Sequence, residues 1–123
     1  MSNYVAIKDL PIFADERGEL VVFDSMSIPF EIKRVFWMDV MSGQVRGGHR
    51  HIKTDQYLVC LKGTVEVYLD DGQRNLNVTL DSINKCLFVK HTDWHTMRFI
   101  EDSILIVLAS HSYEPEDYIY ESY

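Results

Sequence analysis

Short segments in which apolar and polar residues alternate recur along almost the whole chain, and they restrict the fold more than any other feature. A period of two is typical of a β-strand, whose successive side chains point to opposite faces of a sheet. Nine segments are predicted as strands: residues 4–7, 19–23, 32–40, 55–61, 64–69, 75–79, 85–89, 96–100 and 103–109. Turn residues separate them, and Asp71-Gly72 predicts a hairpin between 64–69 and 75–79. We therefore expect a sandwich, a jelly roll or a barrel.

The sequence supports no long helix. Residues 114–119 suit a single helical turn, because Pro115 favours the first helical position. No run approaches the roughly eighteen apolar residues that cross a bilayer, and the first eight residues lack the charged start and apolar run of a signal peptide. We therefore expect one cytoplasmic domain, residues 1–123, without a membrane segment.

The net charge limits the partners. The chain of 123 residues carries a formal charge of −7, which argues against general nucleic-acid binding, because such proteins present a basic surface. A cluster of basic residues nevertheless lies between positions 33 and 53: Lys33, Arg34, Arg46, Arg50 and Lys53. This cluster suits either a solvated surface or a site for an anionic ligand such as a phosphate. Cys60 and Cys86 lie in apolar segments and are expected to be buried free thiols.

The most informative local pattern runs from Gly43 to Gly63. His49 and His51 stand two apart, so on an extended chain both imidazoles point to the same side. The spacing of the glycines, the two histidines and Gln56 resembles the first motif of the cupin superfamily, with glutamine where metal-binding cupins usually have glutamate. The resemblance selects an all-β, single-domain cupin jelly roll (a double-stranded β-helix), whose mouth receives side chains from several strands.

His95 stands where the second cupin motif brings a third histidine to the same mouth, although Lys90 and Thr92 replace the usual proline and glycine. Three imidazoles and Gln56 are able to bind a divalent metal ion, but glutamine is a poorer ligand than a carboxylate. The same histidines are equally suited to metal-free acid–base chemistry, because an imidazole titrates near neutral pH. The spacing alone leaves both interpretations open.

Six stretches match one family in the same order along the chain: residues 28–35, 46–51, 56–63, 94–97, 107–110 and 117–119. They resemble the sugar-nucleotide 3,4-ketoisomerases, cupin enzymes that act on dTDP-4-keto-6-deoxy-D-glucose. The resemblance extends from about Ile12 to Tyr120. It implies an isomerase that uses neither metal nor cofactor and moves the ketone of the hexose from C4 to C3 through an enediol.

The resemblance also implies roles for individual residues. His49 is expected to be the base that removes the C3 proton, and His51 to assist it or relay the proton. Arg46 is expected to face the pyrophosphate or the enediolate, where a fixed cation lowers the barrier. Lys33 and Gln56 complete the expected substrate site. The implied ligand is a dTDP-linked keto-deoxysugar, and the implied assembly is a homodimer with exchanged N-terminal strands, which also covers exposed sheet edges.

Arg17 and His95 bear on the configuration at C4. The branch of the family with a galacto product resembles this chain in having arginine before the glycine of the early turn and histidine in the Trp-His-x-Met segment. The gluco branch has tyrosine and arginine instead. The chain thus resembles the galacto branch, whose product feeds dTDP-3-amino-3,6-dideoxyhexose synthesis for O-antigen or S-layer glycans. The two side chains are expected to share one pocket, and a gluco-product ketoisomerase is the nearest alternative.

The chain departs from the family pattern near these residues. Phe36-Trp37 stands where the family has two tyrosines, one of which helps to move the proton. Gly48, Arg50 and His91 also replace the usual residues. The missing hydroxyl favours a second alternative, a sugar-nucleotide-binding cupin without activity. A third is a metal-dependent cupin that uses His49, His51, Gln56 and His95.

Overall fold

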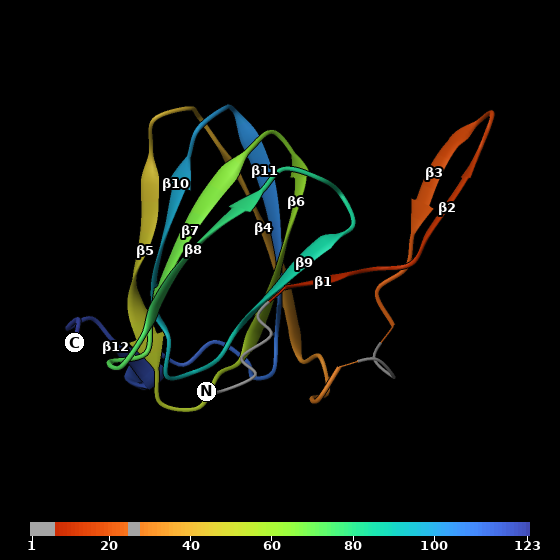
Figure 1. The fold of residues 1–123 in the computed structure, drawn as a ribbon. Helices are drawn as coiled ribbons and strands as arrows, with labels where there is room; N and C mark the ends of the chain where they lie inside the picture. Colours follow the sequence, from red (N-terminus) through yellow and green to blue (C-terminus); the bar gives the residue numbers. More distant parts are fainter. Residues whose placement is uncertain (1–6, 25–27) are drawn as a thin grey trace.

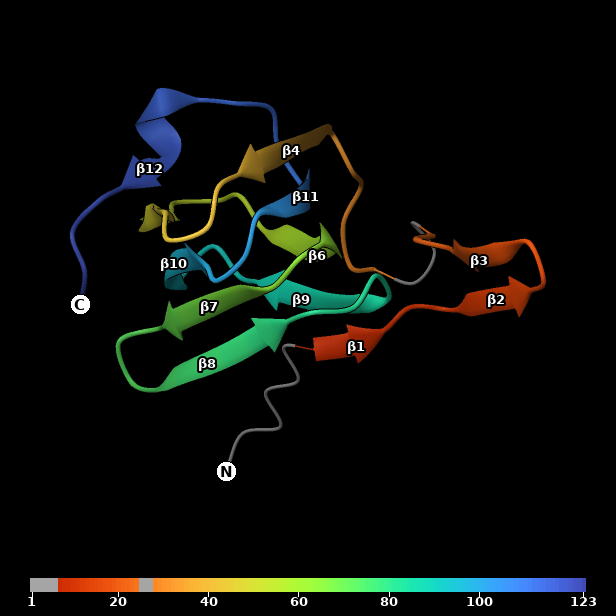
Figure 2. The same cartoon turned by 90° about the horizontal axis from the view of Figure 1, so that it is seen from above.

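Two five-stranded sheets face each other (Figures 1 and 2). The computed structural model describes residues 7–24 and 28–123. The first sheet has the order β1 (Ile7–Asp9), β9 (Lys85–Val89), β6 (Gln56–Lys62), β11 (Ser103–Ala109), β4 (Arg34–Val40). The second has the order β12 (Tyr118–Ile119), β5 (Val45–His51), β10 (Trp94–Phe99), β7 (Val65–Asp70), β8 (Asn75–Leu80).

From β4 onward the chain passes repeatedly from one sheet to the other, with β7 and β8 as the one consecutive pair that stays in a single sheet. The neighbouring strands pair antiparallel throughout both sheets. Two facing antiparallel sheets with this connectivity form a jelly roll. The predicted all-β cupin jelly roll is confirmed.

The core between the sheets explains the period-two pattern of the sequence. Val65, Val67 and Leu69 of β7 are buried there, whereas the residues between them are half-buried. Leu105 and Val107 of β11 project into the same core from the opposite sheet. Each such side chain stabilises the fold by roughly 1.5–3 kcal/mol relative to an exposed position. Alternation therefore records which face of each strand meets the core.

Most of the predicted strands are confirmed to within two residues, namely those that correspond to β3, β4 and β6 to β11. In the first predicted strand only Ile7 is among the described residues, and it begins β1; positions 4–6 lie outside them. The predicted helical turn is present as the 3-10 helix η2 (Pro115–Asp117). The sequence did not predict β2 (Ile12–Asp15), β5 or β12. Cys60 and Cys86 are buried and free, as expected.

The hairpin of β2 and β3 (Gly18–Val21) projects away from the two sheets (Figure 1). Phe13 and Leu20 are cross-strand partners in it, and they are 61% and 62% exposed. Side chains of this size are normally covered in a folded protein. Within the described part of the chain, this apolar pair of the hairpin is therefore exposed to solvent.

The outer face of the first sheet is also apolar. Leu10, Tyr57, Val59 and Cys86 form a second buried cluster there. A cavity of about 300 Å³ adjoins it, with a lining of leucine, isoleucine, valine and phenylalanine side chains. No helix in the described residues is both long and apolar enough to cross a membrane.

Candidate active site

A cavity of about 210 Å³ opens between the sheets at the histidine cluster. Its polar lining residues are Arg46, His49, Gln56, His95 and Tyr118. Its apolar lining residues include Phe36, Met38, Leu58, Met97 and Val107. All the polar residues except Gln56 come from the second sheet, whereas the first sheet contributes mostly apolar side chains. The ionisable groups therefore occupy one wall of the cavity.

The pairing of β5 with β10 brings the histidines together. His49 lies opposite His95 in the register, and a β-bulge follows between His95 and Thr96. Gly47 has a φ of +90°, and a Cβ there would lie 2.8 Å from the carbonyl oxygen of His95. Only glycine permits this approach without strain. The ring centres of His49 and His95 are 4.9 Å apart, and those of His49 and His51 are 5.0 Å apart.

Burial keeps the imidazoles neutral. His95 is fully buried, and its Nδ1 lies 3.1 Å from the carbonyl oxygen of Asp93. Burial, with the charge of His49 as a smaller cause, lowers the pKa of His95 to about 3. The same two causes lower the pKa of His51 to about 4, and burial lowers the pKa of His49 below its ordinary value. At pH 7 all three rings are therefore neutral and able to accept a proton.

His51 is buried and is not among the residues that line the cavity. Its Nε2 is buried and, in the described part of the chain, has no hydrogen-bond partner. The charges of Asp117 and Asp55 raise its pKa and partly oppose the effect of burial. This position suits the assisting or relay role that the sequence suggests.

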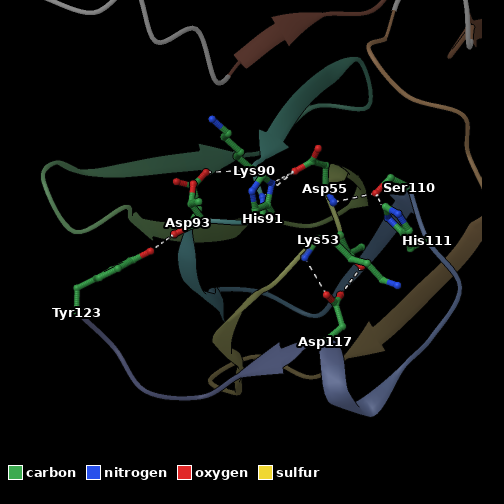
Figure 3. Close-up of polar contacts among 11 residues, drawn as sticks. Lys53, Asp55, Lys90, His91, Asp93, Ser110, His111, Asp117 and Tyr123 are labelled. Carbon is green, nitrogen blue, oxygen red and sulfur yellow. Dashed lines mark hydrogen bonds and ion pairs between the residues drawn. The ribbon is translucent and has the colours of Figure 1, made fainter.

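Asp117 fixes the segment that follows it. Its carboxylate accepts hydrogen bonds from the backbone N–H of Lys53, at 2.8 Å, and from the hydroxyl of Thr54. Its carbonyl oxygen accepts one from the N–H of Ile52 at 2.8 Å. Figure 3 shows Lys53 and Asp117 in contact across these segments. These bonds hold β12 against β5, with Tyr118 opposite His51.

Tyr118 is a site residue that the sequence did not single out. Its ring centre lies 4.8 Å from that of His49 and 4.6 Å from that of His51. It lines the same cavity as His49. The only sequence signal was its place in one of the six stretches that resemble the family.

A second polar layer supports the loop after β5 (Figure 3). The carboxylate of Asp55 lies 2.9 Å from Nδ1 of His91. It also accepts a hydrogen bond from the backbone N–H of His91 at 2.7 Å. The N–H of Asp55 donates to the hydroxyl of Ser110 at 2.9 Å, and that hydroxyl lies 2.8 Å from Nδ1 of His111. The N–H of His51 donates to the carbonyl oxygen of His91. This layer positions the backbone of His51.

The remaining predicted residues lie in different places. Arg46 lines the cavity and is exposed, which places it at the mouth. Gln56 is buried in the opposite wall. Lys33 is exposed and lies outside the described lining.

Arg34, the next residue, acts on the histidine cluster. Its charge lowers the pKa of His51, and its guanidinium carbon lies 4.9 Å from the ring centre of Phe36. Arg34 belongs to the basic cluster of residues 33–53 but was not predicted as a site residue.

Arg17 does not share a pocket with His95 within one chain. It lies in the turn of the projecting hairpin, is 84% exposed and forms an ion pair with Asp15. The hairpin extends away from the two sheets (Figure 1). Any contact between these two residues therefore requires a second copy of the chain.

The donor groups of the cavity depart from the usual ligand set of a metal-binding cupin. In the described residues no three His, Cys, Asp or Glu side chains are arranged to hold a metal ion. The fourth position of the motif is the neutral amide of Gln56. Amide oxygen is a weaker ligand than carboxylate for the metals that imidazole favours.

A jelly roll with convergent histidines in its mouth defines a cupin with a small-molecule site. Residues 3–123 match the family model described as "FdtA: WxcM-like, C-terminal". The chain therefore belongs to the FdtA family. It is an enzyme of the 3,4-ketoisomerase class, as its sequence predicts.

Three of the similar proteins are named as 3,4-oxoisomerases or 3,4-ketoisomerases. The chain is 44% identical to the TDP-4-oxo-6-deoxy-alpha-D-glucose-3,4-oxoisomerase of Aneurinibacillus thermoaerophilus, over 85% of this chain and 78% of that protein. WlaRA, a TDP-fucose-3,4-ketoisomerase from Campylobacter jejuni, is 30% identical with a TM-score of 0.86, over 98% of this chain and 90% of that one. WlaRB, a TDP-quinovose 3,4-ketoisomerase from the same organism, is 31% identical with a TM-score of 0.88, over 94% and 91%.

The buried histidines predict a stability that falls in mild acid. In the unfolded chain an imidazole binds a proton near pH 6.5, whereas folded His51 and His95 do so only near pH 4 and 3. The free energy of unfolding should therefore decrease as the pH falls from 6.5 to 5, by about 2 kcal/mol for each of the two groups. Urea denaturation at several pH values measures this slope, and a His95→Asn variant should show a shallower one. An equal free energy at pH 7 and pH 5 would contradict the neutral, buried state of these rings.

Proposed function

We propose that this protein converts dTDP-4-keto-6-deoxy-D-glucose into dTDP-3-keto-6-deoxy-D-galactose by metal-free acid–base catalysis. The observation that carries the proposal is the wall of neutral imidazoles in the cavity, with Arg46 at its mouth. The 44% identity to an oxoisomerase of the corresponding 4-oxo sugar supports the choice of substrate. The 3-ketone of the product is the group that an amination step requires, which suits synthesis of 3-amino-3,6-dideoxyhexoses for O-antigen or S-layer glycans.

The reaction begins with removal of the C3 proton, which is acidic because it lies next to the C4 ketone. His49 takes this proton, because it is neutral at pH 7 and lines the cavity. Negative charge then develops on the C4 oxygen. The cation of Arg46 stabilises this charge or holds the pyrophosphate, and Gln56 offers an amide from the opposite wall. The ring centre of His51 lies 5.0 Å from that of His49, and His51 assists His49 or relays the proton that His49 takes up.

The one-sided distribution of proton acceptors favours the galacto product. In a D-gluco hexose the C3 hydrogen points to the same face of the ring as the C4 hydrogen of the galacto isomer. A base that takes the C3 proton and returns it to C4 from the same side therefore gives the galacto configuration. His49, His51 and His95 all come from neighbouring strands of the second sheet, on one side of the cavity. The gluco product requires protonation from the opposite, largely apolar wall.

The proposal is tested by incubating the protein with dTDP-4-keto-6-deoxyglucose and following the sugar by NMR. The spectrum reports the position of the ketone and the configuration at C4 together. A protein that binds the substrate but leaves it unchanged is the non-catalytic cupin considered above. Activity that disappears with a chelator and returns with a divalent ion would instead establish the metal-dependent alternative.

His49→Asn should lower the turnover rate by about 10²–10⁴, because asparagine keeps a polar side chain of similar reach but accepts no proton near pH 7. The melting temperature and the affinity for dTDP, measured by calorimetry, should stay close to those of the unchanged protein. Gln73→Asn serves as a control, since Gln73 is exposed and lies outside the cavity lining. If His49→Asn retained more than about a tenth of the rate, His49 would not be the base.

We further propose a homodimer in which each hairpin lies against the partner. The exposed Phe13 and Leu20 supply apolar surface on the hairpin, and the outer face of the first sheet offers an apolar cavity of about 300 Å³. The turn that carries Arg17 would then reach the mouth of the partner's site. This arrangement accounts for the separation of Arg17 from His95 within one chain.

Mixing two defective variants tests this exchange. An Arg17→Ala chain keeps its own His49, and a His49→Asn chain keeps its own Arg17, so a mixed dimer with exchanged hairpins contains one intact site. Unfolding and refolding the two variants together should restore about a quarter of the wild-type rate, since half of randomly assorted dimers are mixed. Each variant refolded alone serves as the control. Mixed dimers without restored activity, or a monomer in light scattering at micromolar concentration, would contradict the arrangement.

Arg17 and His95 are expected to control the configuration at C4. The enediol is planar, so the product depends on which face the proton donor meets, and these two side chains would close one face or position the donor. Arg17→Tyr combined with His95→Arg should therefore shift the product from the galacto toward the gluco form. Either substitution alone should mainly slow the reaction, because two residues of one pocket do not act additively. An active double variant that still gives pure galacto product in NMR would rule out this role.

A further inference from the structure

We propose that Tyr118 carries the proton between the two oxygens of the substrate, while His49 carries the proton between the two carbons. The inference rests on the ketoisomerase function proposed above. It makes Tyr118 a catalytic residue that supplies a hydroxyl to a cavity in which Phe36 supplies none.

Moving a ketone from C4 to C3 requires two protons to change place. One leaves C3 and arrives at C4, and the other leaves the C3 hydroxyl and arrives at the C4 oxygen. The carbon-bound hydrogens stand above or below the plane of the enediol, whereas the two oxygens lie in that plane. A base placed over the face is therefore badly placed for the oxygens, and a second group at the edge of the enediol is needed.

Few polar groups of the cavity qualify for the second transfer. Arg46 does not lose its proton in a protein, and the amide of Gln56 has no proton to exchange near neutral pH. His95 is fully buried with Nδ1 at the carbonyl of Asp93. Among the described residues that line the cavity, Tyr118 alone has a hydroxyl. A phenol donates and accepts through the same oxygen, which is what a shuttle between two oxygens requires.

Tyr118 is also held where such a shuttle has to be. Its ring centre lies 4.8 Å from that of His49, so one substrate can meet both groups. Its position is fixed by the β-pairing with His51 and by the hydrogen bonds of Asp117, and it stacks on Tyr120 with ring centres 6.2 Å apart. A side chain fixed in this way is preorganised for proton transfer.

The proton and electron balance closes without a further reactant. His49 takes the proton from C3, the C3–H electrons form the C3–C4 double bond, and the C4 oxygen takes the proton of the Tyr118 hydroxyl. The phenolate of Tyr118 then takes the proton of the C3 hydroxyl. As the C3 carbonyl forms, the electrons of the double bond accept the proton that His49 returns to C4. Both residues end in their starting states.

Tyr118→Phe in D₂O tests the assignment, with NMR of both substrate and product. Product formation should fall by about 10²–10⁴. Deuterium should still enter C3 of unconverted substrate, because His49 is intact and the enediolate returns to substrate when the oxygen transfer is blocked. The ratio of C3 deuteration to product formation should therefore rise at least about tenfold over that of the unchanged protein.

Tyr68→Phe is the matched control, because it removes the hydroxyl of a tyrosine in β7 that lies outside the cavity lining, and it should leave rate and ratio unchanged. The dTDP affinity and melting temperature of Tyr118→Phe should stay at the wild-type values. Equal losses of deuteration and product formation, or a rate within about threefold of wild type, would overturn the shuttle role. An unchanged protein that fails to convert the substrate would refute the proposed function instead, so the two failures are distinguishable.

Discussion

The pairing of β5 with β10 is the interaction on which the site depends. Its register sets His49 opposite His95 with a bulge beside them, and both imidazoles line the same cavity. This approach is possible because Gly47 has no side chain to meet the carbonyl of His95. A methyl group at position 47 would separate the strands locally, and the distances within the histidine cluster would change before the core between the sheets was affected.

For most strands, burial of one face made the strand predictable, although β3 was predicted despite its exposure. Alternation identified β7 and β11 because one face of each meets the core. It missed β5, whose residues Val45–His51 include a single aliphatic side chain, so that its extended conformation comes from pairing with neighbours. It missed β2 because that strand is exposed along its whole length. The two residues of β12 are too few to show any period.

The site was predictable where it depends on local geometry. His49 and His51 share one side of an extended strand, and that much follows from their spacing. The position of Tyr118 depends on Asp117, which binds Lys53 and Thr54 more than sixty residues earlier in the chain. No local pattern encodes a contact over such a separation. The expected pocket shared by Arg17 and His95 requires a second copy of the chain, because the hairpin projects away from the two sheets.

The exposure of the hairpin has a consequence for how such enzymes diverge. Within one chain, Arg17 is 84% exposed at its turn, and substitutions at such positions usually change the free energy of folding of the chain by less than about 0.5 kcal/mol. His95 and Gly47, in contrast, are enclosed by the sheets. If the hairpin turn helps to determine the product, substitutions in this tolerant segment can change which sugar is made. The residues that carry out the proton transfer lie in a constrained part of the fold and change less easily. Product configuration should then drift among descendants more rapidly than mechanism.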